Sequence, residues 1–295
     1  MTLKLDNVSK TYTLGAFSGK TLRAVRNVSF DVRPGQVVSL IGESGSGKST
    51  VGRMILRLTS ITDGRISLDD EDITTLRGGD LKGYYRKVQG VFQDPFSTYN
   101  PIFRVDHVFE NIRRSYFPGV ALSEWTGRLE TSLRSVNLDP GLVLGRYPHQ
   151  LSGGQLQRVL IARALLLDIK ILVADEIISM LDASTRIDVL NLLAELKARG
   201  LGIVFVTHDL SLGNYISDTT VILRYGAVVE MGATEKVFGD PRHAYTKSLL
   251  AAVPQLHHRW EDEGFGDTSM PVELPTARGD APKLTAVEPD HLVAG

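Results

Sequence analysis

The chain has 295 residues, 42% of them hydrophobic, which is enough to bury the core of one large domain or of one domain with an appendage. Its 33 Lys and Arg residues balance its 34 Asp and Glu residues, so its net charge does not argue for broad binding to nucleic acid or anionic lipid. It has no cysteine, which excludes disulfides, thiolate zinc sites and cysteine-ligated iron–sulfur clusters. No apolar run reaches the roughly 20 residues that span a bilayer, and the first residues do not resemble a signal peptide, so we expect a soluble cytoplasmic protein.

Residues 3–40 are predicted to form β structure. Val28, Phe30 and Val32 alternate with polar residues, and Pro34-Gly35 marks the turn that follows. Tyr12 is expected in the first loop. Its ring could stack on an adenine base or lie half-buried among strands, and the residues alone leave both interpretations open.

The stretch 42–50 matches the phosphate-binding pattern G-x-x-x-x-G-K-[ST], between an apolar strand and a helix. Backbone N–H groups of such a loop converge on phosphate oxygens, Lys48 can reach the terminal phosphates, and the Ser49 hydroxyl can ligate Mg²⁺. The predicted nucleotide-binding residues are Gly42, Glu43, Ser44, Gly45, Ser46, Gly47, Lys48, Ser49 and Thr50. This loop alone fits kinases, GTPases and ATPases equally well.

The next elements alternate between strands and helices, which indicates a mainly parallel α/β sheet. Strands are predicted at 88–92, 171–174 and 203–206, a helical insert at 103–136, and a hairpin at 221–231. Further helices are predicted at 156–167, at 183–199 with Ile187, Leu190, Leu193 and Leu196 on its apolar face, and near 243–253. From residue 257 the chain is rich in proline, glycine and acidic residues, so we expect a mobile tail, dispensable for catalysis from about residue 262.

Polar residues follow the predicted strands at the edge where parallel sheets bind ligands. Asp175 could hold Mg²⁺, and Glu176 could polarise a water molecule in line with a γ-phosphate. Gln93 and His208 end two other strands, where either could contact the nucleotide or serve as an ordinary polar strand end. Ser152 is a predicted helix N-cap, and the glycines that follow it suit an anion.

These residues together resemble the ABC ATPases over about residues 3–255. Leu151-Ser152-Gly153-Gly154-Gln155 is similar to the family's signature motif, accompanied by Walker A at 42–50, Walker B at 171–176, a Q-loop at Gln93, a D-loop at 179–182 and an H-loop at His208. The resemblance implies that Tyr12 stacks on adenine, that Glu176, His208 and Gln93 act in catalysis, and that Ser49, Gln93 and Asp175 bind Mg²⁺. It also implies that Ser152, Gly153, Gly154 and Gln155 contact the ATP held by a second subunit.

Two segments resemble the oligopeptide and dipeptide importers more narrowly: residues 93–101, and residues 240–250 followed by Ala252-Val253-Pro254. Ala244 stands where that subfamily usually has proline, and Ile177, Ile178 and Met180 depart from its usual D-loop region. The resemblance implies a P-loop NTPase fold with an N-terminal antiparallel β subdomain. Residues 1–256 would form the nucleotide-binding domain, with a helical subdomain at about 94–165, and residues 257–295 the tail.

The resemblance implies that this protein is the ATP-hydrolysing subunit of an importer, located at the cytoplasmic face of the membrane. Its expected partners are a second ABC ATPase subunit, either a paralogue or an identical chain, two transmembrane permease subunits and an extracytoplasmic substrate-binding protein, with no nucleic acid. An oligosaccharide importer is the alternative for the substrate. A soluble ABC ATPase of translation or DNA repair is disfavoured, because such proteins carry two cassettes or a long coiled-coil insert.

Overall fold

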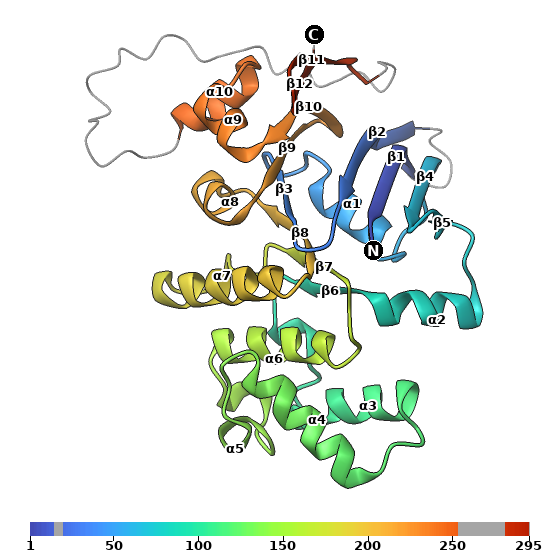
Figure 1. The fold of residues 1–295 in the computed structure, drawn as a ribbon, viewed down its shortest axis with the longest axis vertical. Helices are drawn as coiled ribbons and strands as arrows, with labels where there is room; N and C mark the ends of the chain where they lie inside the picture. Colours follow the sequence, from blue (N-terminus) through green and yellow to red (C-terminus); the bar gives the residue numbers. More distant parts are fainter. Residues whose placement is uncertain (15–19, 253–280, 295) are drawn as a thin grey trace. The chain divides into compact units, whose positions relative to one another are not determined.

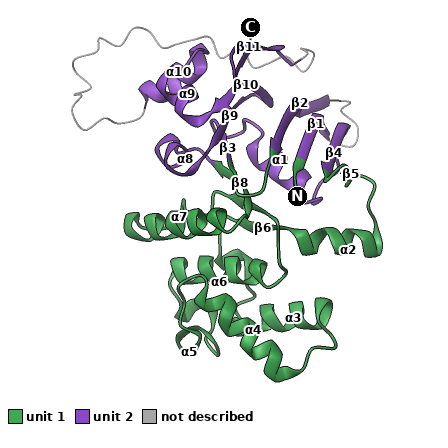
Figure 2. Ribbon diagram, in the orientation of Figure 1, with its two compact units in different colours: residues 1–3, 32–37, 68–206 green, residues 4–31, 38–67, 207–295 purple. Residues whose placement is uncertain are grey.

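The computed structural model describes residues 1–14, 20–252 and 281–294 (Figure 1). The chain divides into two compact units, which are described separately (Figure 2). Unit 1 comprises residues 1–3, 32–37 and 68–206, and unit 2 comprises residues 4–31, 38–67 and 207–295. Within the described ranges, no helix is both long and apolar enough to cross a bilayer.

Unit 2 contains the N-terminal strands and the phosphate-binding loop. In one sheet the strand order includes β2-β1-β4, and in the other it includes β11-β12-β10-β9-β3. The strands are β1 (Leu3–Leu14), β2 (Lys20–Val32), β3 (Val37–Ile41), β4 (Asp63–Leu68), β9 (Thr219–Arg224), β10 (Ala227–Ala233), β11 (Leu284–Glu288) and β12 (His291–Ala294). The helices are α1 (Lys48–Ile55), α8 (Leu210–Ile216), α9 (Thr234–Gly239) and α10 (Ala244–Ala251).

The pairing of β3 and β9 is parallel, with Ile41 opposite Ile222, whereas β9 and β10 form the predicted antiparallel hairpin. All five residues of β3 are buried, as expected of a strand covered on both faces. The carboxyl end of β3 leads directly into the phosphate-binding loop.

The prediction that the chain ends in a tail without packed structure is wrong for residues 284–294. Strands β11 and β12 pair with each other, and β12 adds to β10 with Met231 opposite Leu292. His291 is only 1% exposed and its Nε2 lies 2.7 Å from Oε1 of the fully buried Glu230. The hairpin is held by backbone pairing, by this buried polar contact and by exposed contacts of Lys236 and Arg242 with Glu288. The composition of residues 257–295 carries no signal for these contacts. Residues 257–280 of the predicted tail lie outside the described residues.

Unit 1 contains the parallel strands β6 (Val88–Phe92), β7 (Ile171–Asp175) and β8 (Gly202–Thr207), in which β7 pairs with both neighbours. The helical insert lies between β6 and β7, and its helices are α3 (Asp106–Tyr116), α4 (Leu122–Arg134), α5 (Pro140–Val143) and α6 (Gly153–Leu165). Short helical turns lie at Phe96–Thr98 and Pro148–Gln150. The remaining elements are β5 (Glu71–Asp72), α2 (Gly78–Lys87) and α7 (Ala183–Ala198).

The prediction that Ile187 lies on the apolar face of α7 is wrong. Leu190, Leu193 and Leu196 are buried, but Ile187 is 44% exposed. Ile187 and Leu196 are nine positions apart, and at about 100° per residue this places them on opposite sides of the helix. Val189 and Leu192 complete the buried face instead.

Candidate nucleotide-binding site

The loop 42–50 of unit 2 closes between β3 and α1 in a conformation that requires glycine. Gly47 precedes α1 with a φ of 104°, and an added Cβ would lie 2.6 Å from the Ala24 carbonyl oxygen. Lys48 is 4% exposed, and its Nζ donates to the carbonyl oxygens of Gly42 (2.7 Å) and Glu43 (2.8 Å). The lysine therefore lies along the loop that it is predicted to serve.

The same loop has the donors that an anion needs. The Ser46 hydroxyl is buried and has no hydrogen-bond partner within the described part of the chain. An added Cβ at Gly45 would meet no atom within 4 Å, so this side of the loop is open. The first turn of α1 carries no acidic residue, so no carboxylate on the helix itself neutralises the partial positive charge of its N-terminus. A phosphate group fits this chemistry.

The other two site residues predicted in unit 2 lie outside the loop. Tyr12 lies within β1 rather than in a loop, because the run Thr11-Tyr12-Thr13 favours extended backbone. It is half-buried, and Lys10 Nζ lies 5.0 Å from the centre of its ring. His208 is exposed and precedes Asp209, whose carboxylate caps α8 by accepting the Leu212 N–H at 3.2 Å.

Gln93, Asp175 and Glu176 come together at the carboxyl edge of the unit 1 strands. Phe92 pairs with Asp175 across β6 and β7, so the exposed Gln93 follows at the same edge. Asp175 is 7% exposed, whereas Glu176 is half-buried. Glu176 adopts a φ of 51°, uncommon outside glycine, and its N–H donates to the Val206 carbonyl at 2.9 Å. Strained backbone of this kind is concentrated at functional sites.

The segment after Glu176 explains the unusual sequence of the D-loop. Ile177 and Ile178 are buried and Met180 is 61% exposed, so the two isoleucines serve as core residues. Arg186 fixes the loop by donating to the carbonyl oxygens of Leu181 (2.8 Å) and Ser179 (3.3 Å). Sequence reasoning missed Arg186, because an arginine in the first turn of a helix carries no signal for contacts to the preceding loop.

Asp182 holds the start of α7. Its carboxylate accepts the Thr185 N–H (3.0 Å) and the hydroxyls of Ser184 (2.7 Å) and Thr185 (2.8 Å). These hydrogen bonds, the Thr185 N–H foremost, lower the pKa of the Asp182 carboxyl well below its usual range.

The signature residues 152–155 form the predicted helix start at α6. The Ser152 hydroxyl accepts the Gln155 N–H (3.2 Å), and Gln155 Oε1 accepts the Ser152 N–H (2.9 Å), which together make a capping box. Gly154 packs against α7, since an added Cβ would overlap Cγ2 of Thr185. An added Cβ at Gly153 would make only an ordinary contact, 3.6 Å from Leu181 Cδ2. Gly154 is therefore a packing residue in addition to any role toward a ligand.

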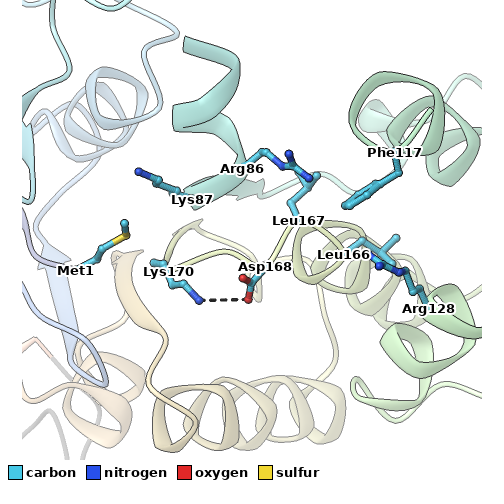
Figure 3. Close-up of a pocket in the computed structure, with 9 residues that line it drawn as sticks. All are labelled: Met1, Arg86, Lys87, Phe117, Arg128, Leu166, Leu167, Asp168 and Lys170. Carbon is cyan, nitrogen blue, oxygen red and sulfur yellow. Dashed lines mark hydrogen bonds and ion pairs between the residues drawn. The ribbon is translucent and has the colours of Figure 1, made fainter. Parts of the chain in front are cut away.

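Unit 1 also has a cavity of about 400 Å³ away from these residues (Figure 3). It lies at the amino ends of β6 and β7, which start immediately after Lys87 and Lys170. The guanidinium carbons of Arg86 and Arg128 lie 5.1 and 5.4 Å from the centre of the Phe117 ring. This is the edge of the strands opposite to Gln93 and Asp175, so the cavity is not the candidate nucleotide site.

Two protein families match different parts of the sequence. The family described as ABC transporter matches residues 25–179, and the one described as oligopeptide/dipeptide transporter, C-terminal region, matches residues 229–278. The oligopeptide transport ATP-binding protein OppF of Streptococcus mutans is 37% identical over 292 residues, 99% of this chain and 93% of the relative. A putative peptide import ATP-binding protein of Brucella ovis is 39% identical over 264 residues, 89% of this chain and 79% of the relative.

Solved structures agree with the sequence comparison. A dimeric ATP-binding cassette in a post-hydrolysis state, bound to ADP and Pi, has a TM-score of 0.70 and 31% identity over 79% of this chain and 98% of its own. A second dimeric structure of the same cassette, described as a bacterial ABC transporter cassette, has a TM-score of 0.69 at the same identity and coverage. The predicted P-loop NTPase fold of the ABC ATPase type is thus confirmed, and the chain belongs to the ATP-binding subunits of the ABC transporter family.

Proposed function

We propose that this chain hydrolyses ATP to drive the import of oligopeptides or dipeptides through a separate membrane permease. The observation that carries the substrate class is the match of residues 229–278 to the C-terminal region of oligopeptide/dipeptide transporters. The relatives described above are named for peptide transport, and no observation favours an oligosaccharide instead.

ATP is proposed to bind with its phosphates on the loop 42–50. Three features support this role: the open side at Gly45, the Ser46 hydroxyl that has no partner among the described residues, and the helix N-terminus. Ser49, Gln93 and Asp175 are the proposed oxygen ligands of Mg²⁺, a donor set that suits this ion. Bound Mg²⁺ would neutralise charge on the phosphates.

Glu176 is proposed as the general base, with Gln93 and His208 as polar contacts of the reacting phosphate and Tyr12 as the adenine contact. Glu176→Gln keeps the size of the side chain but cannot accept a proton, so ATP should bind while single-turnover cleavage falls by about 100-fold or more. Rapid-quench measurement of hydrolysis, beside equilibrium ATP binding, checks this. Cleavage at the wild-type rate would exclude Glu176 as the base.

The proposed assembly is a head-to-tail pair of ATPase subunits, in which residues 152–155 of one subunit face the ATP of the other. The exposed N-cap Ser152 and the capping box support this, because they present a helix start at the surface. Three large apolar side chains after Gln93 are exposed and suit a permease contact, which would place the chain at the membrane surface: Phe96, Ile102 and Phe103.

Purification of a tagged chain from its native membranes tests the assembly and the substrate. We expect two multi-span permease subunits and a second ATPase subunit, identified by intact-complex mass spectrometry. Reconstituted in liposomes with its binding protein, the complex should hydrolyse ATP faster with a mixture of short peptides than without. Stimulation by oligosaccharides but not by peptides would overturn the proposed substrate class.

A further inference from the structure

The C-terminal part of unit 2 contacts the phosphate-binding loop directly. The hydroxyl of Tyr245, in α10, accepts the Glu43 N–H at 3.1 Å across 202 residues of sequence. The carbonyl oxygen of the same Glu43 accepts a hydrogen bond from Lys48 Nζ at 2.8 Å. The backbone of Glu43 is therefore held on one side by the predicted ATP-binding lysine. On the other side it is held by a residue that was not predicted to take part in nucleotide binding.

The ring of Tyr245 is fixed, so its hydroxyl has a defined direction. Tyr245 is 4% exposed and belongs to an apolar cluster with Ile41, the last residue of β3, and with Val229 and Val237. The Arg224 guanidinium carbon lies 4.8 Å from the centre of the ring. Burial raises the pKa of the Tyr245 hydroxyl, which therefore stays protonated at neutral pH.

The start of α10 is fixed by a buried carboxylate. Glu230 accepts the N–H groups of Arg242 (2.8 Å) and His243 (3.0 Å), and His243 Nδ1 accepts the Tyr245 N–H (3.0 Å). His291 of the C-terminal hairpin contacts the same carboxylate at 2.7 Å. A continuous series of hydrogen bonds thus runs from the hairpin through Glu230 to the helix that carries Tyr245.

We propose that Tyr245 is a positioning residue for ATP binding, which holds the Glu43 peptide so that the following N–H groups keep their phosphate-binding arrangement. This inference rests on the proposed role of residues 42–50. A side chain that only filled the apolar cluster would need no hydroxyl aimed at the loop, and phenylalanine would serve equally well there. The loss of the hydroxyl alone separates the two roles.

Tyr245→Phe removes the acceptor and keeps the ring. A net hydrogen-bond contribution of ordinary size predicts that the Kd and KM for MgATP rise about three- to tenfold. The kcat at saturating ATP should change less than twofold, and the Tm of the nucleotide-free protein should stay within about 2 °C, because water can replace the acceptor at the exposed Glu43. Titration calorimetry and steady-state ATPase assays on the full chain measure these quantities.

Tyr225→Phe is the matched control. Its ring also lies beside Arg224, at 5.1 Å, and within the described chain its hydroxyl makes no hydrogen bond to the loop. ATP affinity within twofold of wild type for Tyr245→Phe, or an equal loss in Tyr225→Phe, overturns the inference. So does a lowered Tm with unchanged affinity, which would assign Tyr245 to packing alone. Lys48→Ala tests the proposed nucleotide site independently of Tyr245. If ATP binding survives this change, the proposed site itself is refuted, and not only the role of Tyr245.

Discussion

Replacing His291 with leucine tests how much the C-terminal hairpin stabilises unit 2. Glu230 is fully buried, His291 is 1% exposed, and Nε2 and Oε1 are 2.7 Å apart. Burial alone would raise the pKa of the Glu230 carboxyl, but the nearby Thr246 hydroxyl and the N–H donors of Arg242, His243 and His291 outweigh it and lower that pKa. An ionised carboxylate can only accept, so His291 Nε2 is the donor.

The expected loss of stability in His291→Leu is that of one hydrogen bond donated to a buried charge. Leucine fills much of the space of the imidazole, so the main loss is a hydrogen bond to a charged group, about 1.5–3 kcal/mol. In a domain of this size each kcal/mol corresponds to about 2–4 °C, so Tm should fall by about 3–12 °C at pH 7. His291→Gln, which restores an amide donor, should recover part of the loss.

Calorimetric unfolding of the full-length, nucleotide-free protein measures this, with the exposed His149→Leu as the control that should leave Tm unchanged. A Tm for His291→Leu within 1 °C of wild type would refute the reasoning. Truncation after Trp260 removes the whole hairpin and should lower Tm at least as far. The expectation that the tail from residue 262 is dispensable for ATP hydrolysis stays a prediction, which the ATPase rate of the same truncated protein checks.

Two further predictions concern the glycines that start α6. Gly154→Ala should destabilise the protein by about 1–3 kcal/mol, because the added methyl group overlaps Thr185 Cγ2. Adding Thr185→Ser, which removes that methyl group and keeps the hydroxyl, should restore stability, and a double variant no more stable than Gly154→Ala in denaturant titration would contradict this. Gly153→Asp has room for its Cβ and adds a carboxylate next to the exposed N-cap. ATP binding to the isolated chain should survive this change. The ATP-dependent association of two ATPase subunits, measured by light scattering, should be lost, because the carboxylate repels the phosphates of the partner's ATP. Association at the wild-type level would argue against the head-to-tail arrangement.

The sequence predicted the elements whose signals are local. Strands β3, β7 and β8 are buried, mostly apolar runs that lead directly into motif residues. The start of α6 carries its capping box within four residues. These features located the loop 42–50, Gln93, Asp175, Glu176 and His208 at element ends.

The features that were missed either have a local sequence that resembles a loop or depend on partners far away in the chain. Helix α2 was not predicted, because Gly78-Gly79-Asp80 and a polar surface resemble a loop. Strand β12 pairs with β10 about 60 residues earlier, and only one of its residues, His291, is fully buried. The hydrogen bond from Glu43 to Tyr245 spans 202 residues, so no local sequence pattern predicts it.

The C-terminal hairpin also determines which backbone groups of the second sheet of unit 2 face solvent. Without β12, strand β10 would become an edge strand, and its sequence Ala-Val-Val-Glu-Met-Gly-Ala carries a single charge. An apolar edge with unpaired N–H and C=O groups is a template for pairing with other chains. With the hairpin in place the outer strand is β11, which is mostly exposed, follows Lys283 and ends in Glu288. Shortened versions of this protein should therefore aggregate more readily during expression, even where ATP binding is intact.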